Sequence, residues 1–148
     1  MDSVILLKDR GCGFCYEFDP IYKDIKNRYK NKYKFESFLV SDKNDKKKLK
    51  RKHFEVYKRY MSDGVPTVVL KTKKGVGEVI IPQIVMSNTE EITKASNILY
   101  KNIKKVSKSI NSDKYELFVQ NGGDYYKIKY LKYKQKYNTL KLKNINNV

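Results

Sequence analysis

The chain has 148 residues, an apolar fraction of 40% and a formal net charge of +17, from 33 lysines and arginines against 16 acidic residues. The apolar fraction indicates a globular protein and excludes a wholly disordered chain, and the length suits one compact domain with an extension. The charge favours acidic partners, whether nucleic acid, an anionic membrane or an acidic protein. The alternative is that the charge reflects codon composition. The chain uses Lys, Asn, Tyr and Ile heavily, as an A+T-rich genome encodes, and this bias needs no binding role.

The apolar stretches of the sequence are short. Residues 4–7 are too few for the core of a signal peptide, and they follow Asp2 rather than a basic region. No run approaches the length of a membrane span. We therefore expect a cytoplasmic protein without membrane contact, in a reducing compartment where a cysteine pair is catalytic or metal-binding rather than a structural disulfide.

The first predicted elements surround the two cysteines of the chain. Residues 3–8 form a continuous apolar run with the length of a buried central strand. Directly after it, Cys12 and Cys15 are spaced Cys-x-x-Cys. From Cys12 to Tyr29 apolar side chains recur every three or four residues, which predicts a helix. Pro20 lies inside this helix and is expected to kink it, because proline removes a backbone donor.

Two more elements are predicted in the middle of the chain. Residues 34–40 alternate in the manner of a strand. Residues 41–61 form one basic helical segment, with Ser41 or Asp42 as its cap. The side chains expected on its inner face are Leu49, His53, Val56, Tyr57 and Tyr60.

The same segment carries two lysine-rich runs, residues 46–48 and 50–52. Such runs most simply form a solvated outer face, and anion binding is the alternative. His53 is the sole histidine of the chain, and we interpret it as structural rather than catalytic.

An Asp-Gly turn and Pro66 precede the next predicted strand, which begins at or just after the proline because Thr-Val-Val-Leu is strongly β-prone. Residues 71–77 predict a hairpin loop that returns through a strand at residues 78–81. A helix over residues 88–110 follows, with Asn88 as its cap. Its apolar stripe consists of Ile92, Ala95, Leu99, Ile103, Val106 and Ile110.

The predicted order β-α-β-α-β-β-α accounts for residues 1–110 as one α/β domain, with a central mixed sheet of about four strands flanked by helices. Residues 111–148 remain as a basic C-terminal extension rich in tyrosine and lysine. In this extension apolar residues recur at spacings of four and three, which predicts a short basic helix that is marginal in isolation. These residues are Tyr126, Tyr130, Tyr133, Tyr137 and Leu140.

Residues 1–110 resemble the thioredoxin-fold redox proteins. The resemblance lies in the cysteine motif after a buried strand, in Pro20 five residues past the second cysteine, and in Gly64-Val65-Pro66-Thr67 before a hairpin and a last helix. It implies a thioredoxin-like fold with a cis peptide bond at Val65-Pro66.

The sequence departs from that family at several places. Leu6 lies six residues before Cys12, where thioredoxins usually carry a buried acid that assists proton transfer. The dipeptide Gly13-Phe14 between the cysteines is neither the Gly-Pro of thioredoxins nor the Pro-Tyr of glutaredoxins. A Gly-Gly pair, which glutathione binding would need before the final helix, is not evident near Ile81-Pro82.

The resemblance implies a thiol–disulfide oxidoreductase that acts on protein disulfides and needs no cofactor. Cys12 would be the attacking thiolate, since a helix start aims unpaired N–H groups and its positive dipole end at that sulfur. Cys15 would resolve the mixed disulfide. Backbone groups of Val65 would pair with an extended client segment. The residues expected to bind the substrate are Gly13, Phe14, Val65 and Pro66.

The C-terminal extension has a resemblance of its own. Residues 122–137 are similar to a C-terminal segment on otherwise unrelated proteins of giant amoeba-infecting DNA viruses of mimivirus type. This resemblance implies a viral thioredoxin-like protein, located in the host cytoplasm at the virus factory or packaged in the virion. Virion proteins would then be partners of the extension.

Two alternatives stand beside the redox hypothesis. A metal site would need a dimer or an external ligand, because two cysteines and His53 cannot complete a four-ligand zinc site in one chain. A redox-inactive binding or packaging module would use the basic surface and the extension to bind a virion protein or nucleic acid. The helical spacing of the tyrosines favours a protein over a nucleic acid.

Overall fold

Four strands form one mixed sheet in residues 1–83 and 89–112, the part of the chain that the computed structural model describes. These strands are β1 (Asp2–Lys8), β2 (Tyr33–Leu39), β3 (Thr67–Lys71) and β4 (Val76–Val79). Their order across the sheet is β2-β1-β3-β4. β1 is parallel to β2 and antiparallel to β3, and β3 is antiparallel to β4. The predicted α/β class with a mixed sheet of four strands is confirmed.

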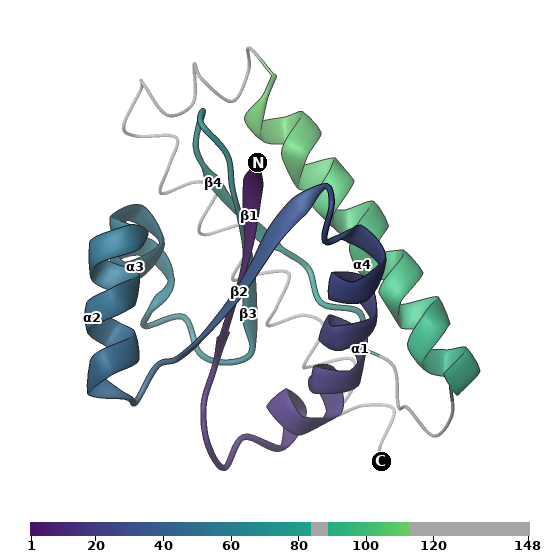
Figure 1. Ribbon diagram of the computed structural model, residues 1–148, viewed down its shortest axis with the longest axis horizontal. Coiled ribbons are helices and arrows are strands. Elements are labelled where there is room, and N and C mark those ends of the chain that lie inside the picture. Colours follow the sequence, from purple (N-terminus) through teal and green to yellow (C-terminus); the bar gives the residue numbers. More distant parts are fainter. Residues whose placement is uncertain (84–88, 113–148) are drawn as a thin grey trace, which may run out of the picture. The chain divides into compact units, whose positions relative to one another are not determined.

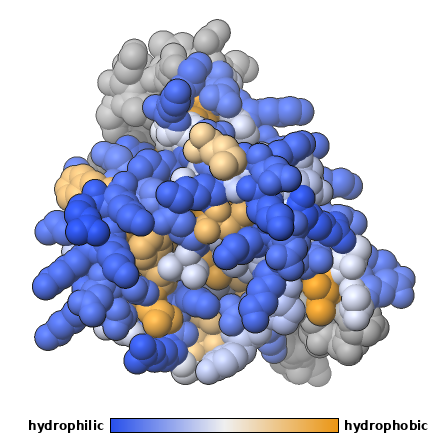
Figure 2. All heavy atoms as spheres, viewed as in Figure 1, coloured by the Kyte–Doolittle hydropathy of each residue, from blue (hydrophilic) through white to orange (hydrophobic). Residues whose placement is uncertain are grey.

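Helices cover both faces of this sheet. α1 (Gly13–Tyr29) and α4 (Thr89–Ile110) lie on one side, and α2 (Lys43–Lys52) and α3 (Phe54–Tyr60) lie on the other (Figure 1). On the first side, the rings of Tyr29 and Tyr100 stack with their centroids 3.8 Å apart. On the second side, hydrophilic side chains predominate over the region of α2 and α3 (Figure 2).

β1 is the centre of the fold, because it pairs along both edges and is covered on both faces. Residues 4–7 are all fully buried, which is why this strand is a continuous apolar run rather than an alternating one. On the side of α2 and α3, Ile5 and Leu7 join a core built from both helices and three other strands. The further buried members of this core are Phe38, Leu49, Val56, Tyr60, Val69 and Val76.

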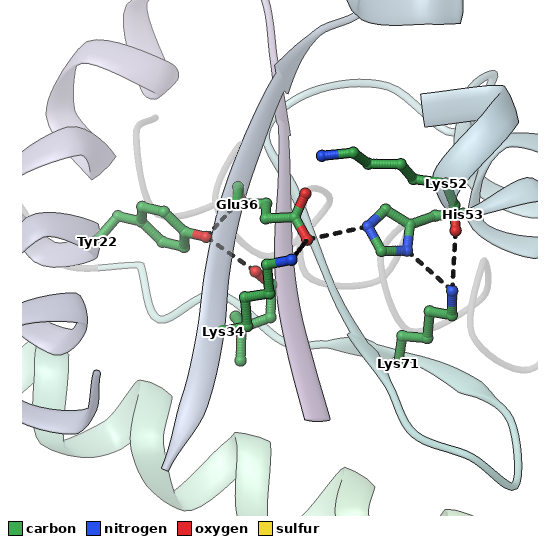
Figure 3. A network of polar contacts seen from close by, with 7 residues as sticks. Tyr22, Lys34, Glu36, Lys52, His53 and Lys71 are labelled. Carbon is green, nitrogen blue, oxygen red and sulfur yellow. Dashed lines mark hydrogen bonds and ion pairs between the residues drawn. The ribbon is translucent and has the colours of Figure 1, made fainter. Parts of the chain in front are cut away.

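The predicted single helix over residues 41–61 is wrong in one respect, because the chain breaks at His53 into α2 and α3. His53 has φ −138° and ψ 63°, outside the helical region. Its ring is buried, and Nε2 lies 3.1 Å from a carboxylate oxygen of Glu36 on β2. On the other side of the ring, the ammonium of Lys71 donates to Nδ1 over 2.9 Å and to the Lys52 carbonyl over 3.1 Å (Figure 3).

The predicted hairpin is shifted along the chain. β3 continues through Lys71 and β4 already begins at Val76, so the loop is shorter than the predicted one over residues 71–77. The N–H of Thr72 donates to the carbonyl of Gly75 over 2.8 Å and closes this loop. The predicted cap Asn88 and the predicted helix of the C-terminal extension lie outside the described residues.

Residues Met1–Ile110 form one compact unit, and Asn111–Val148 form a second. Of the second unit, only residues 111 and 112 belong to the described part of the chain. The site described below lies entirely within the first unit.

Candidate dithiol site

Cys12 is the N-cap residue of α1. Its backbone is extended, with φ −89° and ψ 110°, and its sulfur accepts the N–H of Cys15 over 3.2 Å. The sulfur therefore takes the place of the hydroxyl or carboxylate oxygen that usually accepts this bond at a helix start. Gly11, with φ +74°, allows the chain to turn between the end of β1 and this cap.

Cys15 lies one turn further along α1 and is only 4% exposed, whereas Cys12 is partly exposed. Burial raises the pKa of the Cys15 thiol to about 11, and its hydrogen bond with Cys12 contributes to the same rise. Both cysteines are free thiols in this structure. The pair is therefore asymmetric, with one sulfur within reach of a partner and the other covered and protonated at neutral pH.

The segment at Val65-Pro66 lies beside Cys12, although more than fifty positions separate them in the sequence. The Cys12 thiol donates to the Val65 carbonyl over 3.9 Å. The reason is the topology, because β3 runs antiparallel to β1 and Thr67 is opposite Leu7, so the start of β3 meets the end of β1. The Val65-Pro66 peptide bond is cis, as the resemblance implied.

The turn before β3 is held by its own residues. The hydroxyl of Thr67 is buried and donates to the Gly64 carbonyl over 2.8 Å. Gly64 has φ +90°, a conformation that favours glycine. These two residues fix the position of the Val65 carbonyl relative to the cysteine motif.

The predicted substrate-binding residues differ in exposure. Phe14 is 62% exposed and Gly13 is exposed, while Val65 and Pro66 are partly buried. Tyr16, which the sequence reasoning missed, is 71% exposed directly after Cys15. Two exposed aromatic rings thus flank the buried cysteine in the sequence. An aromatic residue at an outward helical position next to the motif was the signal available for Tyr16.

Charged groups surround the loop between β1 and α1. Asp9 accepts the hydroxyl of Ser41, and this hydrogen bond, followed by one from the N–H of Arg10, lowers the pKa of the Asp9 carboxyl. Lys8 forms an ion pair with Asp19 of α1 at 3.5 Å. Leu6 is 1% exposed, so the sheet position beneath the motif is apolar, as the sequence indicated.

In residues 1–83 and 89–112, no group of three or more His, Cys, Asp or Glu side chains could hold a metal ion. His53 bonds with Glu36 and Lys71 instead of joining the cysteines. Within the same described residues, no helix is long and apolar enough to cross a membrane.

Comparison with known proteins adds no relative, since no protein-family model and no curated protein matches the chain. The function therefore has to be argued from the geometry of the dithiol site.

Proposed function

We propose that the protein is a thioredoxin-like thiol–disulfide oxidoreductase of protein clients, with Cys12 as the attacking residue and Cys15 as the resolving residue. The observation that carries the proposal is the asymmetry of the two thiols. Cys12 is a partly exposed helix cap that accepts an N–H bond from Cys15, and Cys15 is buried with a pKa raised to about 11.

In the first step, the Cys12 thiolate attacks one sulfur of a client disulfide. The client S–S bond breaks, a bond forms between Cys12 and that sulfur, and the other client sulfur leaves as a thiolate. In the second step, the Cys15 thiol gives up its proton and attacks the Cys12 sulfur. The mixed disulfide then breaks, the Cys12–Cys15 disulfide forms, and two electrons have passed to the client. The reverse sequence oxidises a client dithiol.

The raised pKa of Cys15 explains why Cys12 attacks first and Cys15 second. A thiol that stays protonated at neutral pH does not compete with Cys12 for the client disulfide. Its proton has to leave in the second step, and the departing client thiolate is a base of suitable strength close to it. Leu6 supplies no carboxylate beneath the motif for this transfer.

The client would lie across the exposed side of the motif. The Val65 carbonyl accepts the Cys12 thiol over 3.9 Å, and it would accept from an extended client backbone once Cys12 has lost its proton. Phe14 gives the same area an apolar contact, because its ring is mostly exposed. We further propose, on the resemblance of residues 122–137 alone, that the protein acts in a virus-infected host, in the cytoplasm or in the virion.

The proposal is tested by following the reduction of a fluorescent peptide disulfide, with dithiothreitol as the electron source. We expect the wild-type chain to turn over many times and Cys12→Ser to lose activity at least a hundredfold. In a single turnover of the pre-reduced protein without dithiothreitol, Cys15→Ser should accumulate a mixed disulfide with the client, visible as a mass adduct on Cys12. Ser62→Ala, at an exposed serine, serves as the matched control and should behave as wild type.

Two results would contradict the proposal. Equal activity of Cys12→Ser and wild type would show that Cys12 is not the attacking residue. A folded wild-type protein that reduces the peptide no faster than dithiothreitol alone would favour the redox-inactive binding module.

A further inference from the structure

α2 carries an unusual concentration of positive charge. Its ten residues read Lys-Asn-Asp-Lys-Lys-Lys-Leu-Lys-Arg-Lys, and Leu49 is the only one that is buried. The seven basic side chains are all exposed and lie around the rest of the helix surface: Lys43, Lys46, Lys47, Lys48, Lys50, Arg51 and Lys52.

Each of the other helices contains at least one ion pair between side chains four residues apart, and α2, which the structure describes in full, contains none. Arg28 pairs with Asp24 on α1, Arg59 with Glu55 on α3, and Lys94 with Glu90 on α4. Among the described residues, no carboxylate forms an ion pair with a basic side chain of α2. Its two nearby acids lie at its start, where Asp42 accepts the N–H of Asp45 and Asp45 accepts the N–H of Leu39.

The charges of α2 also repel one another. Lys43, Lys47 and Arg51 follow each other at intervals of four residues, and so do Lys46 and Lys50. Like charges at this spacing destabilise a helix, whereas an ordinary solvated face intersperses the two signs. No ion pair with a carboxylate of the described residues offsets this repulsion. A bound anionic partner would offset it.

α2 begins at the same edge of the sheet as the dithiol site. Because β1 and β2 are parallel and Lys8 is opposite Leu39, the loops that lead to α1 and to α2 leave this edge side by side. The hydrogen bond between Ser41 and Asp9 joins the two loops. α2 then runs along the sheet face opposite α1 (Figure 1).

We propose that the outer face of α2 binds an acidic segment of the client polypeptide while Cys12 attacks the client's disulfide. This inference rests on the proposed function. A ten-residue helix is about 15 Å long, so it matches an extended acidic segment of about four or five residues. The client class is therefore proteins with a run of Asp or Glu near a disulfide.

The residues of α2 favour a polypeptide over nucleic acid. The helix has no aromatic side chain on which a base could stack. Its seven cations suit carboxylates and phosphates alike, so the absence of a stacking surface on α2 is what favours a polypeptide.

The test compares the reduction of two synthetic peptides by the full chain. Each is linked by a disulfide to the same fluorescent peptide, and the cysteine is flanked by about four glutamates in one and by the same number of glutamines in the other. The test variant is Lys43→Gln, Lys47→Gln and Arg51→Gln together, because glutamine keeps the helix propensity. The control variant makes the same charge change at exposed positions of α4, with Lys101→Gln, Lys105→Gln and Lys108→Gln.

We expect wild type to reduce the glutamate peptide with a kcat/KM about tenfold above that of the glutamine peptide at low salt, and this preference should fall at high salt. The α2 variant should lose the preference and keep its rate on the glutamine peptide. The α4 control should keep both. The α2 variant should also melt no lower than wild type, since it removes like-charge pairs.

Three results would overturn the inference. The first is a preference for the glutamate peptide that survives in the α2 variant, and the second is an equal loss of that preference in the α4 control. The third is stronger displacement of the glutamate peptide by a single-stranded oligonucleotide of the same charge than by the unlabelled peptide. Failure of the proposed function would look different, because neither peptide would be reduced. Fluorescence anisotropy with the cysteine-free peptides would then still decide whether α2 prefers the acidic one.

Discussion

The backbone N–H of Cys15 donates to the sulfur of Cys12 over 3.2 Å, while the thiol of Cys15 is covered by the protein. One helical turn thus gives the two sulfurs different environments. Cys12 faces the partly exposed turn at Val65, and Cys15 faces the interior. Two residues of the same type therefore lie in two distinct environments.

The first prediction concerns the reactivity of the two thiols toward iodoacetamide. Because burial holds the pKa of Cys15 near 11, its thiolate fraction at pH 7 is about 10⁻⁴. We expect Cys12 to be alkylated first and almost exclusively at this pH, measured by peptide mass spectrometry. In Cys12→Ser, alkylation of Cys15 should be slow and should rise about tenfold per pH unit between pH 7 and 9. A plateau near pH 8 would contradict the assigned environment of Cys15.

A second prediction concerns the exposed aromatic residues beside the motif. Phe14→Ala and Tyr16→Ala should each raise the KM for a protein disulfide several-fold, because each ring is mostly exposed beside the motif. Reduction of a small aromatic disulfide should change less than twofold. Phe54→Ala is the matched control, since Phe54 is 52% exposed on α3, and it should leave both substrates unaffected. An equal effect on the small disulfide would mean that the rings act on the cysteines themselves.

Much of the site could be predicted from local sequence patterns. The buried run of β1 and the apolar periodicity of α1 are signals contained in consecutive residues, so they fix Cys12 at a strand-to-helix junction. The proximity of Val65 is different, because it depends on the antiparallel pairing of β1 with β3, two strands distant in the sequence. No spacing in the chain encodes that pairing, and only the family resemblance pointed to it.

The two errors in the fold have tertiary causes. The apolar spacing of Leu49, Val56 and Tyr60 continues across His53, and the break arises because the buried ring reaches Glu36 on β2 and Lys71 on β3. In the second error, the sequence predicted that Gly77 is part of the hairpin loop. It belongs to β4, where it is paired with Leu70 of β3, and α4 packs so closely over this position that a side chain has no room.

A third prediction is a loss of stability when His53 is protonated. Lys71 offers only donors, so Nδ1 of the neutral ring accepts from its ammonium and Nε2–H donates to Glu36. Burial lowers the pKa of His53, and the charges of Lys71 and Lys52 add to this against the opposing effect of Glu36. A lowered folded-state pKa means that the unfolded chain binds the proton more readily. The contribution to stability is therefore complete above about pH 6.5 and is lost as the pH falls below that value.

Urea unfolding at a series of pH values between 5 and 8 measures this effect. We expect the free energy of unfolding of wild type to fall toward pH 5, and that of His53→Gln to change less over the same range. Lys71→Met is the complementary variant, because it removes the ammonium that opposes protonation of the ring. It should reduce the pH dependence as well. An unchanged dependence in His53→Gln would assign the effect to another group.

The last prediction concerns the contact between β4 and α4. A Cβ added at Gly77 would lie 2.7 Å from the Cγ1 atom of Val106, which is closer than two carbon atoms can approach. Gly77→Ala should therefore destabilise the protein by about 1–3 kcal/mol, because the helix or the strand has to shift. Combining it with Val106→Ala should recover part of this loss and give an interaction energy between the two sites of at least about 0.5 kcal/mol in a double-mutant cycle. Gly13→Ala is the control: an added Cβ there meets nothing within 4 Å, and alanine favours the first turn of α1, so the free energy of unfolding should stay equal or rise. Additive effects at Gly77 and Val106 would show that the steric conflict is relieved elsewhere.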